Sequence, residues 1–349
     1  MEPVELHGTA FEMGEQHGRR LARLISQVVV QELPAGWDGI PSLQEQIGST
    51  EKNLAKRFPE TLEEMAGIAA GAKLSYNQIL LLNLSYEFES GVSQTSTNCT
   101  AIGLPGVTTG PFVAKTDDVY LSERSFEIFF RARPQHGCES MYYAFGGTLW
   151  NHGGINRAGL AVAMTGLPAF GPPNLAGIPS LIFLRLLLFY CETVDQALVF
   201  CKANPLLRFG CTLTMADRCS SDIIVVENLP ATRHTYRSPG EPTVRTNHSL
   251  APDIQVHESS SSAPNHFQFP DIRRNSQQRL EQASRLVHEI PYTVLGLQQL
   301  MANHARVGAI CQHGEAGLHT SIAMILDPKR LEIIASEGYG CGSYITYTF

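Results

Sequence analysis

The sequence lacks the features that mark several large classes of protein. Its 26 Lys and Arg residues are outnumbered by 33 Asp and Glu residues and form no cluster, which argues against a nucleic-acid partner. The longest apolar run, residues 178–191, is interrupted by Pro179 and Arg185 and is shorter than the roughly 20 residues of a membrane-spanning helix. Residues 1–5 have neither the basic nor the apolar part of a secretory signal, so we expect a cytoplasmic protein without a membrane span.

Closely spaced cysteines are also missing. The eight cysteines occur without CxxC or CxxH spacing, which argues against a zinc site. In a reducing compartment most of them should be free thiols that pack as small apolar side chains. We therefore expect no metal and no organic cofactor.

The pattern of apolar residues changes along the 349-residue chain. In the first quarter, apolar residues recur at helical spacing, although Gly14 and Gly18 weaken the prediction of the first helix. The remainder of the chain is rich in runs of β-branched and aromatic residues, which are typical of strands. Such strands, following one another directly beside helices, predict an α+β fold of antiparallel sheets covered by helices. Residues 249–274, rich in Ser and Pro, are expected to form a loop or insertion. Helices are expected at 11–32, 42–57, 59–71, 75–89, 180–190, 194–203, 276–289 and 293–304, and strands at 112–119, 126–132, 141–145, 160–164, 212–216, 223–226, 320–326 and 331–335.

Cys99 stands where the helical part gives way to the strands. It heads a short apolar run after the polar residues 93–98, which we expect to be an exposed segment. If the peptide bond after Asn98 is cut, Cys99 gains an α-amine that titrates near neutral pH and can take the thiol proton. The alternatives are an ordinary packed cysteine and, in a secreted protein, a glycosylated Asn98 sequon.

Polar residues at two other places could serve such a thiol. Lys115 and the acids up to Asp118 lie in a strand-like run 16 residues later, and a β-hairpin would place them beside Cys99, where a cation stabilises a thiolate. A solvated ion pair at a turn is the alternative. Asn247 ends another expected strand and could donate to an oxyanion, or could simply be a turn residue. Its neighbour His248 offers a conventional base.

An ordered set of motifs runs along nearly the whole chain. With it the sequence resembles peptidase family C45, the autoproteolytic acyltransferases and hydrolases typified by acyl-CoA:6-aminopenicillanic acid acyltransferase, in the N-terminal nucleophile (Ntn) hydrolase superfamily. The segments that carry the resemblance are residues 6–18, 64–71, 80–83, 99–101, 115–118, 154–162, 246–248, 276–280, 310–313 and 320–328.

The resemblance implies a fold and a division of the chain. The fold would be a four-layer αββα sandwich of two antiparallel sheets between helical layers. Residues 1–98 would be a helical pro-segment that stays associated, as a small subunit, with the catalytic core formed by residues 99–349. The uncut chain would be a zymogen that cleaves itself between Asn98 and Cys99.

The resemblance also implies roles for five residues. Cys99 would be the nucleophile, with its own amine as base, and Asn247 would donate to the oxyanion. Asp118 would order the Cys99 terminus, and Arg279 would be a supporting or substrate-facing cation. Lys115 stands where the bile-salt hydrolase relatives have an arginine.

Two further departures from the family pattern concern the neighbours of these residues. Asn98 replaces the glycine that precedes the nucleophile in the penicillin enzyme, and a strained scissile bond is easier to build with glycine. Thr165, followed by glycine, stands where relatives have an asparagine, so one amide donor is missing.

Together these observations predict an enzyme that hydrolyses or transfers the acyl group of an N-acyl amine or small amide through a thioester on Cys99. Its partners would be small acyl or amide substrates, with an acyl-CoA or an amine as candidates for the second substrate. A different hypothesis is an unprocessed, non-catalytic binding or scaffold protein of the same fold. A third is a conventional cysteine hydrolase with His248 or His313 as base.

Overall fold

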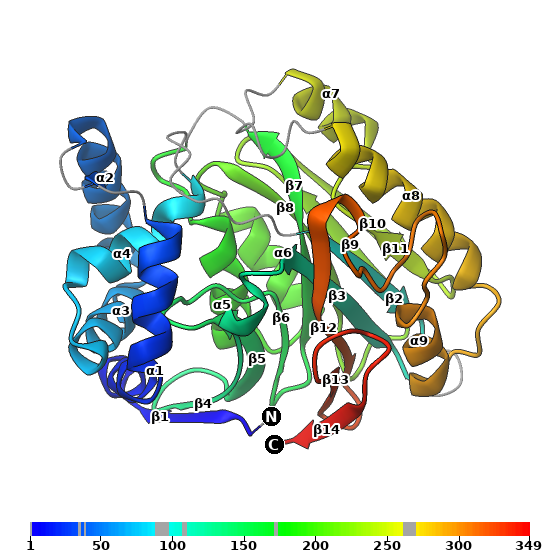
Figure 1. Cartoon of the computed structure of the whole chain (residues 1–349), viewed down its shortest axis with the longest axis horizontal. Helices are drawn as coiled ribbons and strands as arrows, with labels where there is room; N and C mark the ends of the chain where they lie inside the picture. The colour runs from blue at the N-terminus through cyan, green and yellow to red at the C-terminus, as the bar shows by residue number, and fades with distance from the viewer. Residues whose placement is uncertain are drawn as a thin grey trace.

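The computed structural model describes residues 2–33, 36–37, 40–87, 98–106, 110–170, 174–260 and 270–349. Two β-sheets lie in the middle of the molecule, with α1 to α4 on the left and α8 and α9 on the right in Figure 1. The larger sheet has the order β1 (Val4–Gly8), β4 (Glu127–Pro134), β5 (Ser140–Phe145), β6 (Gly153–Asn156), β7 (Ala161–Phe170), β8 (Phe209–Ala216), β9 (Ile223–Asn228) and β10 (Arg233–Ser238). The smaller sheet has the order β11 (Thr243–Arg245), β2 (Asn98–Leu104), β3 (Phe112–Tyr120), β12 (Leu318–Asp327), β13 (Glu332–Ser336) and β14 (Tyr344–Thr348).

Helices cover the outer face of each sheet. Six of them pack on the larger sheet, α7 packs near its β7 strand, and the last two cover the smaller sheet. The helices are α1 (Ala10–Glu32), α2 (Pro41–Arg57), α3 (Pro59–Ala72), α4 (Tyr76–Leu84), α5 (Ser180–Tyr190), α6 (Val194–Ala203), α7 (Pro252–Ser260), α8 (Pro270–Leu286) and α9 (Val294–Met301).

Three apolar cores separate four layers. Side chains alternate between the two faces of a strand, so each sheet contributes to two cores. In β12, Met324 faces the core between the sheets, whereas its neighbour Ile325 packs under α8 and α9. In β5, Tyr143 faces the same central core and Tyr142 faces α1 to α6. The four-layer αββα arrangement predicted from the sequence is therefore confirmed.

Several details differ from the predictions. The strand β1 pairs parallel with β4, so the larger sheet is mixed, not purely antiparallel. Residues 252–260 and 270–274 are helical, although their Ser and Pro content predicted a loop, because prolines stand at the first position of both helices, where their missing N–H costs nothing. Asn98 is buried, with 1% of its surface exposed, because it already belongs to β2; residues 93–97 lie outside the described residues.

Among the described residues no helix is long and apolar enough to span a lipid bilayer.

The helical layer over the larger sheet contains a very close pair of helices, α1 and α3. Gly14 and Gly18 of α1 face Gly67 and Gly71 of α3, and a Cβ atom added at any of the four would lie between 2.0 and 2.2 Å from a backbone oxygen of the other helix. Real Cβ atoms do not approach backbone so closely, so these positions require glycine. The two glycines that weakened the expected first helix are thus explained by packing rather than by a turn.

Substitution of one such glycine should be costly. We expect Gly67→Ala to reduce the free energy of unfolding by about 3 kcal/mol or more, because the new methyl group meets the carbonyl oxygen of Phe11, which cannot move as a side chain would. Gly48→Ala in α2 is the matched control: nothing lies within 4 Å of its added Cβ, and alanine should stabilise that helix by up to about 1 kcal/mol. Urea unfolding of both variants checks this, and similar effects at the two sites would contradict it.

Candidate active site

The site is built on the hairpin formed by β2 and β3. Cys99 pairs with Asp117, and Ala101 pairs with Lys115, in antiparallel register. Because residues two apart on a strand share a face, Cys99, Lys115 and Asp117 all point toward the larger sheet. Asp118 points to the opposite face, toward α8. The hairpin predicted from the sequence is confirmed, and it separates the two acids of the polar run.

On the inner face, the thiol of Cys99 meets a buried ion pair. Its Sγ donates a hydrogen bond to Oδ1 of Asp117 at 3.1 Å, and the same carboxylate oxygen lies 2.7 Å from Nζ of Lys115. The Lys115 ammonium also donates to the carbonyl oxygen of His152 at 2.8 Å. Burial raises the pKa of the Cys99 thiol well above its usual value; Lys115 opposes this rise and Asp117 adds to it. In the uncut chain Cys99 is therefore a protonated thiol.

The backbone of Cys99 is held from both sides. Its N–H donates to Oδ1 of Asn247 at 2.7 Å, and its carbonyl oxygen accepts from Nη1 of Arg279 at 2.5 Å. A second guanidinium nitrogen of Arg279 donates to the same Oδ1 at 2.9 Å, and Nδ2 of Asn247 donates to the carbonyl oxygen of Gly166 at 3.2 Å. Two donors on Oδ1 and one acceptor on Nδ2 fix the orientation of the amide.

Two distant segments supply these partners. Asn247 follows β11, which pairs antiparallel with β2, so the chain beyond Arg245 runs alongside Cys99. Arg279 lies on α8 and is fully buried; its Nε donates to Oδ1 of Asn275, one helical turn earlier, at 2.7 Å. The planar guanidinium thus contacts Asn275 on its own helix, the backbone of Cys99 and the amide of Asn247 at once.

Asp118 belongs to the α8 side of the hairpin. Its Oδ1 accepts a hydrogen bond from Thr320 at 2.6 Å, and its Oδ2 lies 3.9 Å from Nη1 of Arg279. Burial raises the pKa of Asp118 to about 7, although Arg279 and Thr320 both act to lower it. Its predicted role, to order a free Cys99 terminus, stays a prediction, because the uncut chain has an amide at that position.

The pKa of Asp118 predicts that stability falls as pH rises. An unfolded Asp ionises near pH 4, so between about pH 4 and pH 7 only the unfolded chain releases this proton. The contribution of Asp118 to the free energy of unfolding is fully present below about pH 4 and is lost above about pH 7. The free energy of unfolding decreases by up to about 4 kcal/mol over this range. In Cys99→Ala protein, adding Asp118→Asn should flatten urea-derived stability over this range, whereas the exposed Asp195→Asn should not. Parallel profiles with and without Asp118→Asn would contradict the assignment.

All five residues predicted for the site, Cys99, Lys115, Asp118, Asn247 and Arg279, lie in this one region. The sequence did not single out Glu127 and His152, which are buried beside the ion pair: Nδ1 of His152 lies 3.7 Å from Asp117 and 3.5 Å from Glu127. A charged residue at an inward position of the expected strand 126–132 was the one available signal for Glu127.

The two histidines considered as conventional bases have other partners. Nδ1 of His248 lies 2.8 Å from the hydroxyl of Ser276, and burial lowers its pKa to about 4. His313 hydrogen-bonds to Cys311 and Cys341. At Thr165, one of the departures noted in the sequence, the hydroxyl is buried and has no hydrogen-bond partner among the residues that the structure describes.

A cavity of about 290 Å³ lies elsewhere, among α1, α3 and α5. Its lining includes Met13, Glu64 and Arg185 and none of the five site residues. This cavity is therefore separate from the region around Cys99.

Comparison with known families shows to which family the chain belongs. The model of the family described as acyl-coenzyme A:6-aminopenicillanic acid acyl-transferase matches residues 107–317. The chain belongs to this family. The resemblance found in the sequence is thus confirmed. The matched range includes Lys115, Asp118, Asn247 and Arg279, and it begins after Cys99.

A curated member of the acyltransferase family is also similar to the chain. The 40 kDa form of acyl-coenzyme A:6-aminopenicillanic-acid-acyltransferase from Emericella nidulans is 24% identical over 199 residues, which are 53% of this chain and 52% of the relative. The chain thus matches about half the length of that relative.

Two solved structures are also similar to part of the chain. A mutant conjugated bile acid hydrolase from Clostridium perfringens has a TM-score of 0.48 and 12% identity, covering 72% of this chain and 97% of that one. The N-acylethanolamine-hydrolyzing acid amidase ortholog from Caenorhabditis elegans has a TM-score of 0.47 and 9% identity, covering 66% and 93%.

Proposed function

We propose that this family member cleaves itself between Asn98 and Cys99 and then hydrolyses or transfers the acyl group of an N-acyl amine or small amide through a Cys99 thioester. The observation that carries the proposal is the set of contacts on one residue. The thiol of Cys99 touches a carboxylate paired with Lys115, and its backbone N–H and carbonyl are held by Asn247 and Arg279.

In the self-cleavage step, Sγ of Cys99 attacks the carbonyl carbon of Asn98. Asp117 accepts the thiol proton through the existing hydrogen bond, and the proton passes to the departing Cys99 nitrogen. The first product is a thioester between Asn98 and Sγ, and water then hydrolyses it to a free Asn98 carboxylate. Asn247 supports this step because it holds the scissile N–H in one orientation.

In the acyl-transfer step, the new α-amine of Cys99 replaces Asp117 as the nearest base. An α-amine titrates near pH 8, so it can take the thiol proton at neutral pH and return it to the leaving amine of the substrate. We propose that Asp118 and Asn247 then hold this ammonium group and that the Asn247 amide donates to the oxyanion. Lys115 stabilises the thiolate as a point charge.

After cleavage, residues 1–98 would form a small subunit and residues 99–349 the catalytic core, still packed together. Water as the second nucleophile gives hydrolysis, and an amine gives acyl transfer. The name of the Emericella relative makes acyl-CoA thioesters the first acyl donors to test, followed by N-acyl amines.

The test is the denatured intact mass of the protein before and after incubation with these donors. We expect two fragments whose masses match residues 1–98 and 99–349, and an acyl adduct on the larger fragment alone after rapid acid quenching. A single full-length mass with no product from any donor would instead support the unprocessed binding protein of this fold.

A further inference from the structure

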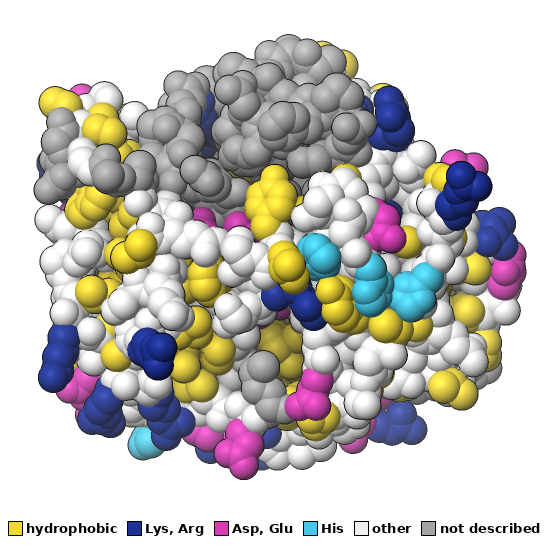
Figure 2. All heavy atoms as spheres, in the orientation of Figure 1, with side chains coloured by type: hydrophobic (Ala, Val, Ile, Leu, Met, Phe, Trp, Pro, Cys, Tyr) yellow, Lys and Arg dark blue, Asp and Glu magenta, His cyan; other side chains and the backbone are white. Residues whose placement is uncertain are grey.

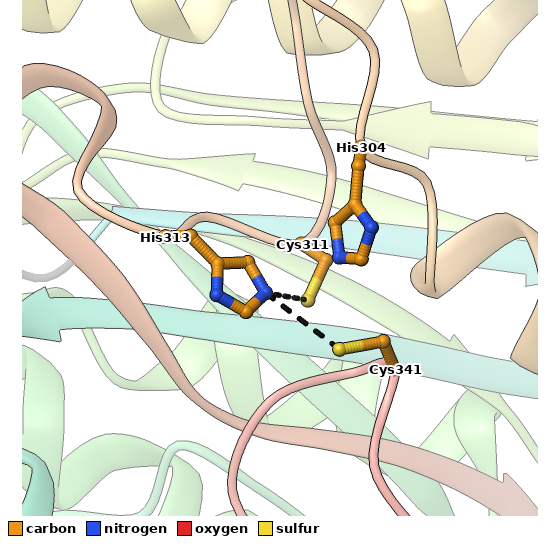
Figure 3. Close-up of side chains that lie close together, drawn as sticks. All are labelled: His304, Cys311, His313 and Cys341. Atoms are coloured by element: carbon orange, nitrogen blue, oxygen red, sulfur yellow. Dashed lines mark hydrogen bonds between the residues drawn. The ribbon is translucent and has the colours of Figure 1, made fainter.

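Four side chains of the kind that bind metals converge away from the active site (Figure 3). His304 follows α9, Cys311 and His313 lie in the segment before β12, and Cys341 lies in the loop between β13 and β14. One ligand atom of each residue lies within 4.8 Å of those of the other three. In Figure 3 the imidazole rings of His304 and His313 and the sulfur atoms of Cys311 and Cys341 lie close together.

We propose that these four side chains bind one zinc ion in a tetrahedral site. Two thiolates and two imidazoles are a preferred ligand set of Zn²⁺. With Zn–S near 2.3 Å and Zn–N near 2.0 Å, a tetrahedron separates a sulfur from a nitrogen by about 3.5 Å. Nε2 of His313 lies 3.4 Å from Sγ of Cys311 and 3.6 Å from Sγ of Cys341, which are the separations that such a site requires.

The site is open to solvent and held in shape by its neighbours. Cys311 is buried, whereas the other three ligands are exposed, so an ion can enter from water. The ring of Tyr339 stacks on that of His313, with centroids 3.9 Å apart and planes 16° apart, which fixes the orientation of the imidazole. Figure 2 shows histidine side chains gathered on this face of the molecule.

The missing CxxC and CxxH spacing argued against zinc in the sequence. That spacing is typical of sites in which each pair of ligands comes from one short turn. Here the ligands come from three segments, and the fold brings them together. Binding releases one proton from each cysteine thiol and needs no oxidant, since Zn²⁺ does not change its charge.

A bound ion would fix a segment that reaches the active site. Gln312 stands between two of the ligands; its Oε1 accepts from Asn275 at 3.1 Å, and Oδ1 of Asn275 accepts from Arg279. Its backbone N–H donates to Thr320 at 2.8 Å, and Thr320 donates to Asp118. A bound zinc ion would thus fix the backbone on both sides of Gln312, which contacts Asn275 and Thr320.

The experiment uses the full chain, reduced, stripped with a chelator and titrated with Co²⁺ and then Zn²⁺. We expect one Co²⁺ per chain, with thiolate-to-cobalt charge-transfer bands and the strong visible bands of tetrahedral cobalt, and their loss on adding one equivalent of Zn²⁺. Native mass spectrometry should show one zinc per chain. Cys341→Ser and the exposed His304→Ala should each weaken binding by more than about 100-fold, because loss of a ligand costs more than loss of an outer partner.

Two controls separate this site from other thiols. Cys219→Ser removes an exposed cysteine outside the cluster, and Cys99→Ala removes the proposed nucleophile; both should keep the cobalt spectrum. Absence of charge-transfer bands in the folded, reduced wild type would overturn the proposal. Undiminished metal binding in Cys341→Ser and His304→Ala would also overturn it. A cluster that takes up no metal, and that forms only a Cys311–Cys341 disulfide on oxidation, would overturn it as well. None of these readouts depends on acyl transfer.

Discussion

Replacement of Cys99 by alanine should leave the chain in one piece and reduce its turnover of any amide or thioester substrate by at least about 10⁴-fold. The magnitude follows from other enzymes, in which removal of a residue of the catalytic triad reduces kcat by about 10⁴- to 10⁶-fold. The activity that remains comes from substrate binding and oxyanion stabilisation. Both steps of the proposed function use the same sulfur, so both should disappear together. Intact mass and product formation, measured on the same sample, check the two steps.

The matched control is another buried thiol. Cys201 in α6 is fully buried and lies outside the site, so Cys201→Ala should cost some packing energy while leaving self-cleavage and turnover in place. If Cys99→Ala protein still separated into fragments ending at Asn98, cleavage would depend on another group or a contaminating protease. If it retained full turnover, the nucleophile would have to be sought elsewhere.

Replacement of Arg279 by lysine should slow self-cleavage and turnover by about 100-fold while preserving the fold. The guanidinium donates to the Cys99 carbonyl, to Thr100 and to Asn247 at the same time. A lysine ammonium keeps the charge opposite Asp118 but is a point charge on a flexible stem and cannot reproduce this planar fork. Loss of one well-placed hydrogen-bond donor at a reacting group typically costs 10²- to 10³-fold.

The control for this prediction lies on the same helix. Arg285 is exposed and pairs with Glu289, so Arg285→Lys should change neither rate. Thermal unfolding of Arg279→Lys should stay close to that of the wild type, because Asp118 retains a buried cation. A variant that unfolds early, or one with unchanged cleavage, would show that Arg279 supports the fold and not the site.

The hairpin at the centre of the site was within reach of sequence reasoning. A strand beginning at Cys99 and a polar run starting at Lys115 are short, regular patterns, and antiparallel pairing of neighbouring strands is the simplest connection. Strand alternation also implies that Asp117 and Asp118 point to opposite faces. Which of them faces Cys99 depends on the register, and a shift of one residue would exchange them.

The rest of the site depended on contacts across the fold. Arg279 is 180 residues from Cys99 in the chain, and only the family resemblance suggested it. His152 approaches Asp117 from the segment before β6, a strand missed because it begins with two glycines. The same limit applies to β1, whose parallel partner β4 lies more than a hundred residues away.

The pairing of β1 with β4 determines how a cut after Asn98 would affect the unfolding and refolding of the protein. The segment before the cut supplies an edge strand and the helices that cover the larger sheet. Side chains near its end reach across as well: Asn83 accepts from the N–H of Leu149 at 2.6 Å, and Glu87 accepts from that of Phe209 at 2.9 Å. Two fragments so joined would melt in a single transition, but their refolding would become bimolecular, with a midpoint that depends on protein concentration. The protein would fold first as one uncut chain. After cleavage and unfolding, its refolding rate would be limited by the association of the two fragments.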